Sequence, residues 1–282
     1  MNKRIFSYFS DFAGRIIDII ANFLLPKEKK VKFLEELGPN GLFESIPRSE
    51  NFDFETDKIK AIFNYKTVLC RQAIWEIKYR ANKKLIRDFG LLLYEYILEE
   101  LTDLGTFDNF KNIILIPIPS SKERTKEKGF NQCILICQEL IKIDKERDGN
   151  NFTLLENLLI KNVDTPHQSH VSNRKKRLQN LKNTFNLNQS AWPDTGNNPL
   201  RLTRTNHSGG FSDIRPSQTV GTALGAIRFP LSGESFPCGL ADHSFIIIDD
   251  VITTGATMNE AFRAFKTAGI LPTKIRGYAL AH

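Results

Sequence analysis

The sequence predicts an α/β protein in which a mainly parallel sheet is flanked by helices. Two segments carry this prediction, because each consists of a short apolar strand, a polar loop and an amphipathic helix. The two strands cover residues 113–119 and 245–248, and such continuous apolar runs are typical of strands buried on both faces. Hydrophobic residues make up 41% of the 282 residues, which is enough to build a substantial core.

The other predicted elements follow from local periodicity and turn signals. Residues 1–30 alternate basic and apolar side chains and predict a helix, whereas residues 31–57 look like a loop because of the turn residues Gly38-Pro39-Asn40-Gly41. The remaining elements are, in chain order, a strand at 61–65, helices at 72–79 and 85–104, a polar loop at 120–129, a helix at 130–143, a loop at 249–256, a helix at 258–268 and a strand at 274–281.

A break in composition separates the two strand–loop–helix segments. No lysine occurs between Lys182 and Lys266, and residues 190–240 hold seven glycines and five prolines. Long loops without structure are uncommon inside compact domains, so most of 188–243 is interpreted as a poorly structured insertion, with a substrate lid as the alternative. The predicted organisation is an N-terminal appendage, residues 1–57, followed by one α/β domain, residues 58–282.

Charge and cysteine content restrict the class of protein only weakly. The net charge of +7 suits an anionic ligand or weak contact with nucleic acid, and requires neither. The four cysteines are scattered and form no C-x-x-C motif, so the sequence supports neither a disulfide scaffold nor a zinc ribbon.

No apolar run approaches the roughly 18 residues of a membrane span. The apolar stretch 16–25 is short and contains Asp18, which favours an amphipathic helix, or a membrane-surface anchor, over a signal peptide. A cytoplasmic location is therefore expected.

The most specific signal is an acidic pair followed by a threonine-rich loop, at 245–257. The apolar strand ends in Asp249 and Asp250, at the edge where open α/β sheets bind ligands. Residues 253–257 then lead into a helix N-terminus, where unpaired backbone N–H groups favour an anion such as phosphate. Carboxylates accept hydrogen bonds from sugar hydroxyls and can bind Mg²⁺. The combination predicts a ribose phosphate ligand; a solvated acidic strand end before an ordinary helix cap is the alternative.

Residues 245–257 resemble the 5-phosphoribosyl-1-pyrophosphate (PRPP) signature of type I phosphoribosyltransferases. Other segments resemble one branch of that superfamily, the ComF/GntX-like proteins, and the similarity covers roughly residues 58–187 and 244–282. The similar segments are Ile77-Lys78-Tyr79-Arg80, Ile116-Pro117-Ile118-Pro119, Lys128-Gly129-Phe130-Asn131-Gln132, and Thr165-Pro166 with Gln168-Ser169, Arg177, Asn180 and Phe185. The resemblance implies a type I phosphoribosyltransferase fold for the α/β domain.

The resemblance also implies roles for individual residues. Asp249 and Asp250 would hold the ribose 2- and 3-hydroxyls, directly or through Mg²⁺. The residues implied to hold the 5-phosphate are Thr253, Thr254, Gly255, Ala256 and Thr257. Pyrophosphate would face Arg124 and Lys128, in a loop for which a solvated charged turn is the alternative. A mobile loop would carry Arg174, Lys175 and Arg177, for which a basic solvated helix is the alternative.

Two departures from the family pattern concern the N-terminus and the insertion. Members of the family commonly carry an N-terminal four-cysteine zinc module, whereas residues 1–57 contain no cysteine, so no zinc is expected. The related segments are also much shorter between positions like Phe185 and Phe245, which supports the interpretation of 188–243 as an insertion and leaves open that it impairs the enzyme.

As an enzyme, the protein would transfer phosphoribose from PRPP to an unidentified nitrogen acceptor and release pyrophosphate. The branch is linked by name to DNA-uptake competence, which identifies no substrate. The rival hypothesis is a non-catalytic protein that binds ribose phosphate or assists DNA handling. The stretch 75–79 mixes aromatic and basic residues as single-strand DNA binders often do, although core packing explains it too. Loss of PRPP binding on replacement of Asp249 and Asp250 would favour the enzyme.

Overall fold

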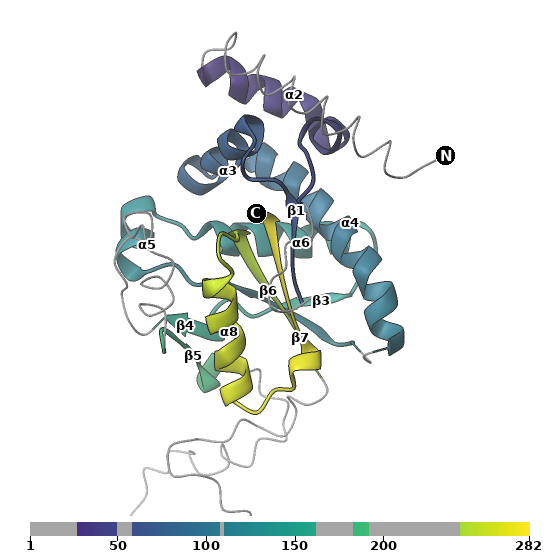
Figure 1. Cartoon of the computed structure of the whole chain (residues 1–282), viewed down its shortest axis with the longest axis vertical. Helices are drawn as coiled ribbons and strands as arrows, with labels where there is room; N and C mark the ends of the chain where they lie inside the picture. The colour runs from purple at the N-terminus through teal and green to yellow at the C-terminus, as the bar shows by residue number, and fades with distance from the viewer. Residues whose placement is uncertain (1–26, 50–57, 108–109, 162–182, 192–242) are drawn as a thin grey trace, which may run out of the picture.

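A computed structural model of the chain describes residues 27–49, 58–107, 110–161, 183–191 and 243–282 (Figure 1). Five strands form the main sheet, in the order β1-β7-β6-β2-β3, and every neighbouring pair is parallel. The strands are β1 (Ile59–Phe63), β2 (Ile113–Pro117), β3 (Phe152–Leu154), β6 (Ser244–Val251) and β7 (Ile275–Ala281). The predicted α/β class, a parallel sheet flanked by helices, is confirmed.

Helices connect the strands and cover both faces of the sheet (Figure 1). They are α2 (Lys27–Ser45), α3 (Val68–Arg80), α4 (Lys83–Phe107), α5 (Lys122–Lys128), α6 (Gln132–Glu146) and α8 (Ala256–Thr267), with two short 3₁₀ turns, η2 (Gln189–Ala191) and η4 (Pro272–Lys274). A separate antiparallel pair, β4 (Leu159–Lys161) and β5 (Phe185–Leu187), lies beside α8. None of the described helices combines the length and apolar character needed to cross a membrane.

The alternation of side chains along the strands creates two cores. In β6, Ile246 and Ile248 join a cluster built from α2, α3, α4 and α6. Phe245 and Ile247, which point the other way, join a cluster formed with α8 and the β4–β5 pair. All four isoleucine and phenylalanine side chains are fully buried, so β6 lies at the centre of the domain and its carboxyl end is held on both sides.

The loop expected at 31–57 is wrong for residues 31–45, which belong to α2. The helix is kinked at Gly38, whose φ of 62° ends the first helical segment, and Pro39 starts the second. Leu34 and Leu42, one on each side of the kink, are fully buried against α3 and α4. Tertiary packing of these two side chains outweighs the local turn signals.

The loop expected at 120–129 is also wrong, because α5 forms within it. Its caps define it: Ser121 accepts a hydrogen bond from the backbone N–H of Arg124 at 3.3 Å, and Gly129 ends it at φ 80°. The loop expected at 249–256 starts later, since β6 continues to Val251. Most of the predicted helix 1–30 and of the insertion 188–243 lies outside the described residues.

Candidate functional site

The chain leaves the adjacent strands β2 and β6 in opposite directions at their carboxyl ends. β2 continues through α5 and α6 to β3 on one side of the sheet, whereas β6 continues through α8 to β7 on the other. The strands themselves are adjacent, and the backbone N–H of Ile118 donates to the carbonyl of Ile248 at 2.9 Å. Such a topological switch point is where open α/β sheets bind ligands. The predicted acidic pair lies at this point.

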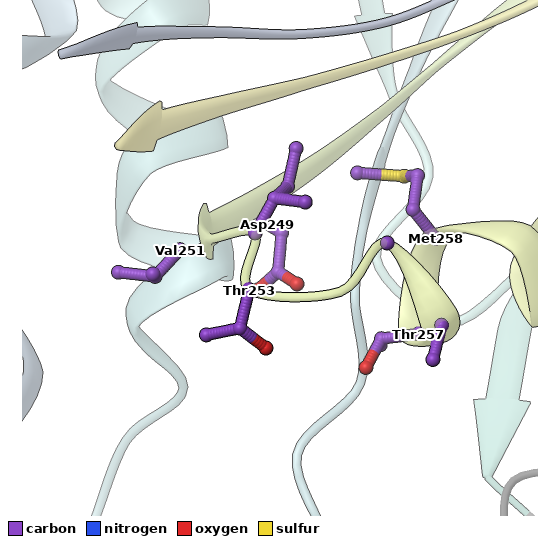
Figure 2. A pocket seen from close by; sticks show the side chains of 8 residues that line it. Asp249, Val251, Thr253, Thr257 and Met258 are labelled. Atoms are coloured by element: carbon purple, nitrogen blue, oxygen red, sulfur yellow. The ribbon is translucent and has the colours of Figure 1, made fainter. Parts of the chain in front are cut away.

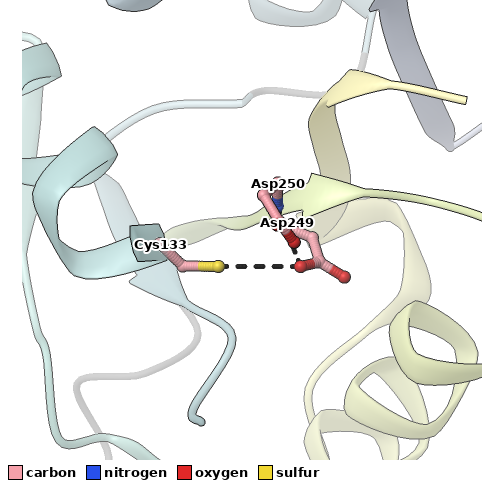
Figure 3. A group of neighbouring side chains, drawn as sticks. All are labelled: Cys133, Asp249 and Asp250. Atoms are coloured by element: carbon pink, nitrogen blue, oxygen red, sulfur yellow. Dashed lines mark hydrogen bonds between the residues drawn. The ribbon is translucent and has the colours of Figure 1, made fainter. Parts of the chain in front are cut away.

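Asp249 is a buried carboxyl group with two donors from the protein. Its Oδ1 accepts from the backbone N–H of Asp250 at 2.8 Å and from the thiol of Cys133 at 3.6 Å (Figure 3). Burial, and then the charge of Asp250, raises the pKa of Asp249 well above its ordinary value. Burial also raises the pKa of the Cys133 thiol, which keeps its proton and can donate it.

The pKa of Asp250 shifts in the opposite direction, because its carboxylate is paired with a lysine. Its side chain points to the other face of β6, where Oδ2 lies 3.1 Å from Nζ of Lys78 in α3. Burial alone would raise the pKa of Asp250, but the Lys78 ammonium outweighs it and lowers that pKa below its ordinary value. In the same way, Asp250 overcomes the burial of Lys78 and raises the pKa of that ammonium. Burial thus favours the protonated form of Asp249, whereas Lys78 favours the ionised form of its neighbour Asp250.

The predicted phosphate loop connects β6 to α8 (Figure 2). Gly255 occupies the N-cap position of α8 with φ 71°, a left-handed conformation that glycine adopts without strain. Gly255 has no side chain to cap the helix, and the side-chain acceptor at its start is Thr254 Oγ1, which lies 3.4 Å from the backbone N–H of Ala256, so the N–H groups of the first turn face the loop. The loop surrounds an open hollow of about 20 Å³, lined by Asp249, Val251, Ile252, Thr253, Gly255, Ala256, Thr257 and Met258. This arrangement can accept a small anion at the helix N-terminus.

The segment 128–132 has a structural role beside the acidic pair. Asn131 caps α6, accepting from the backbone N–H of Cys133 at 2.9 Å. Its Nδ2 donates to the carbonyl of Ile118 at 3.0 Å, which ties the start of α6 to the end of β2. These two hydrogen bonds place Cys133 opposite Asp249.

The structure brings Lys128 into the neighbourhood of the acidic pair. Its ammonium lies 4.3 Å from the ring centroid of Tyr79 in α3, the residue after Lys78. Burial, and then the charges of Lys78 and Arg124, lowers the pKa of Lys128, although Asp250 opposes this shift. Both residues predicted to face pyrophosphate therefore lie on the Lys78 side of the site. The predicted mobile-loop residues Arg174, Lys175 and Arg177 lie outside the described residues.

Three side chains at the acidic pair could together bind a metal ion. The ligand atoms of Cys133, Asp249 and Asp250 lie within 4.8 Å of one another. The two carboxylates fit Mg²⁺, which prefers oxygen, whereas a thiol is a ligand for softer metals such as zinc. Lys78 already neutralises Asp250, so a cation bound at this carboxylate would compete with the ammonium.

Sequence reasoning singled out the acidic pair and the threonine-rich loop but missed two partners of the acidic pair. It placed Lys78 only in a stretch of mixed aromatic and basic residues and in a segment of family resemblance, and gave Cys133 no role. Both reach the site from helices that pack against β6, so only the tertiary fold reveals the contacts.

Comparison with known proteins adds no relative to this picture. No family model matches the chain, and no curated protein has a significantly similar sequence. The fold and the site define an α/β protein with a five-stranded parallel sheet, flanked by helices, and with acidic, threonine-rich and basic groups at its switch point.

Proposed function

We propose that the protein is a phosphoribosyltransferase of the type I fold, related to the ComF/GntX-like branch. One observation carries the proposal: an acidic pair and a threonine-rich loop at a helix N-terminus share the carboxyl end of the strand at the switch point. A loop for phosphate alone would not need two carboxylates, which repel anions. A ligand that has both hydroxyls and a phosphate accounts for both features.

The proposed ligand is PRPP. Its 5-phosphate would lie against the backbone N–H groups and threonine hydroxyls of residues 253–257, and its ribose hydroxyls would donate to Asp249 and Asp250. The pyrophosphate would face the basic side of the site, formed by Lys128 and Arg124 of α5. Asp249 and Asp250 would hold Mg²⁺ directly or through water, adding positive charge opposite the leaving group.

The proposed reaction is a substitution at C1 of the ribose. A nitrogen of the acceptor donates its electron pair to C1, and the bond from C1 to the pyrophosphate oxygen breaks with its electrons on that oxygen. The acceptor nitrogen then loses its proton to water or a base. Positive charge on the ribose in the transition state would be stabilised by the ionised carboxylate of Asp250, and negative charge on pyrophosphate by Lys128 and Arg124, so positioning and electrostatics would supply the catalysis.

Calorimetric titration of PRPP with Mg²⁺ tests the proposal. Wild-type protein should bind, and the double variant Asp249→Asn, Asp250→Asn should lose at least about tenfold in affinity. Asp148→Asn is a suitable control, because Asp148 is an exposed aspartate with φ 55°, a conformation that asparagine also tolerates. Equal binding by wild type and the double variant, or no binding by either, would contradict the proposal. Once binding is established, a screen of nitrogen bases for pyrophosphate release would identify the acceptor.

A second candidate function, binding of single-stranded DNA without catalysis, is favoured by the surface of α3. Trp75 and Tyr79 lie 5.5 Å apart and Arg80 lies 5.1 Å from the Trp75 ring, while Tyr79 is 50% exposed. Aromatic and basic side chains together suit stacked bases and a phosphate backbone. An oligodeoxythymidylate should then bind with a strong salt dependence, and Trp75→Ala should weaken that binding while PRPP affinity stays unchanged.

A further inference from the structure

We propose that Lys78 of α3 binds the diphosphate group of the ligand, with Asp250 as its buried anchor. This inference rests on the proposed function and extends it, because neither the acidic motif nor the loop after β2 contains Lys78. It assigns a substrate-contacting role to a helix that lies outside the loops at the carboxyl ends of the strands.

The ion pair between Lys78 and Asp250 is unequal in exposure. The Asp250 side chain is 5% exposed, whereas that of Lys78 is 30% exposed, so Lys78 is the partner that solvent and a ligand can reach. An ammonium group has three N–H donors, and the contact of 3.1 Å to Oδ2 is an ion pair without hydrogen-bond geometry, since Oδ2 has no hydrogen-bond partner among the described residues. The buried carboxylate therefore fixes the position of Nζ while leaving donors for a ligand that approaches from solvent.

Positive charge converges on this side of the site. Lys128 lies over the ring of Tyr79, and the charges of Lys78 and Arg124 both disfavour its charged form. Asp250 and Glu127 oppose this effect only in part, and an anion with several negative charges relieves the repulsion among the three cations. Diphosphate carries more charge than a single phosphate ester and can span several donors, so it fits this cluster better than the small hollow at the threonine loop.

Lys78 also lies where the diphosphate of the proposed ligand would extend from the ribose. If the ribose hydroxyls meet the acidic pair and the 5-phosphate meets residues 253–257, the substituent at C1 leaves the ribose away from that loop. Lys78 binds the face of β6 opposite to Asp249 and lies beside α5, the segment that follows β2. It therefore connects the ribose end of the site to the predicted pyrophosphate residues Arg124 and Lys128.

Calorimetry with two separate probes, inorganic pyrophosphate and ribose 5-phosphate, tests the inference on the full chain. Lys78→Met should weaken pyrophosphate binding by about tenfold or more, the loss expected for one charge-assisted hydrogen bond, and change ribose 5-phosphate binding by less than about twofold. Lys78→Arg, which keeps the charge, should restore most of the pyrophosphate affinity. Asp250→Asn should show the reverse order and weaken ribose 5-phosphate more than pyrophosphate.

Lys84→Met is the matched control, because Lys84 forms a similar ion pair with the buried Asp88 at 3.2 Å, in α4. It should leave both affinities unchanged. If Lys78→Met does not fold, Lys78→Met with Asp250→Asn removes the unpaired carboxylate as well, and should bind pyrophosphate about tenfold more weakly than Asp250→Asn alone.

Each other outcome overturns the inference in a distinguishable way. Wild-type pyrophosphate affinity in Lys78→Met, or equal loss of both probes, would make Lys78 a structural residue and leave the proposed function intact. A wild-type protein that binds neither probe would overturn both proposals. Binding of an oligodeoxythymidylate that depends on Lys78, without binding of pyrophosphate, would assign the cations to nucleic acid instead.

Discussion

The ion pair between Lys78 and Asp250 allows a quantitative prediction about stability. Replacing one partner of a buried pair leaves an uncompensated charge, which costs about 3–5 kcal/mol. Lys78 is 30% exposed and Asp250 only 5%, so Lys78→Met strands the more deeply buried group while water gains some access to it. We therefore expect Lys78→Met to lower the free energy of unfolding by about 3 kcal/mol, the lower end of that range.

The measurement is urea denaturation followed by circular dichroism, as a double-mutant cycle with Asp250→Asn. The double variant should recover about 2 kcal/mol of the loss, because it no longer buries an unpaired charge. The control is the surface pair of Arg147 and Glu95, whose side chains are 44% and 52% exposed, so Glu95→Gln should cost about 1 kcal/mol or less. A coupling energy below about 0.5 kcal/mol between Lys78 and Asp250, or equal losses in Lys78→Met and Glu95→Gln, would refute the reasoning.

Three further substitutions test other parts of the structure by urea denaturation. Gly255→Ala should lower the free energy of unfolding by about 1–2 kcal/mol, because its φ of 71° strains any residue with a Cβ. Burial and the charge of Asp250 raise the pKa of Asp249 to about 8, so the folded protein holds a proton that the unfolded chain loses, and stability falls as pH rises from about 4 to 8; Asp249→Asn should remove this dependence and be the more stable protein at the upper end. Tyr94→Phe should cost about 2 kcal/mol, since it removes the hydrogen bond of 2.9 Å to the buried Asp144.

Different results would contradict each of these three predictions. Wild-type stability in Gly255→Ala would argue against the left-handed conformation at the helix start. An Asp249→Asn variant with the same pH dependence as wild type would show that Asp249 is ionised throughout. An unchanged Tyr94→Phe would mean that water replaces the hydroxyl at Asp144.

The central strands and the acidic motif could be predicted because their signals are local. The apolar runs of β2 and β6 have no charged residue before Asp249, and the sheet buries every residue of β2. By contrast, β3, β4 and β5 are three residues long, too short for alternation to be recognised. Helix α5 has no apolar face and depends on its two caps, which a count of hydrophobic residues does not detect.

The environment of the motif could not be predicted, because it depends on contacts between distant segments. The sequence identifies Asp249 and Asp250 as a pair of equivalent carboxylates. The fold separates them, since alternation along β6 turns Asp250 toward Lys78 and Asp249 toward Cys133. The opposite pKa shifts of the two carboxyl groups therefore result from the packing of α3 and α6, which no local pattern encodes.

The pairing of β1 with β7 links the outer edge of the sheet to the charge of the site. α3 follows β1 within a few residues, and β1 is held in the sheet by its register with β7, in which Ile59 pairs with Gly277. Outer strands open more readily than central ones, because fewer contacts hold them. Fraying of β1 would loosen the attachment of α3 and allow Lys78 to leave Asp250. The electrostatic state of the site is thus coupled to an edge strand that contributes none of its residues.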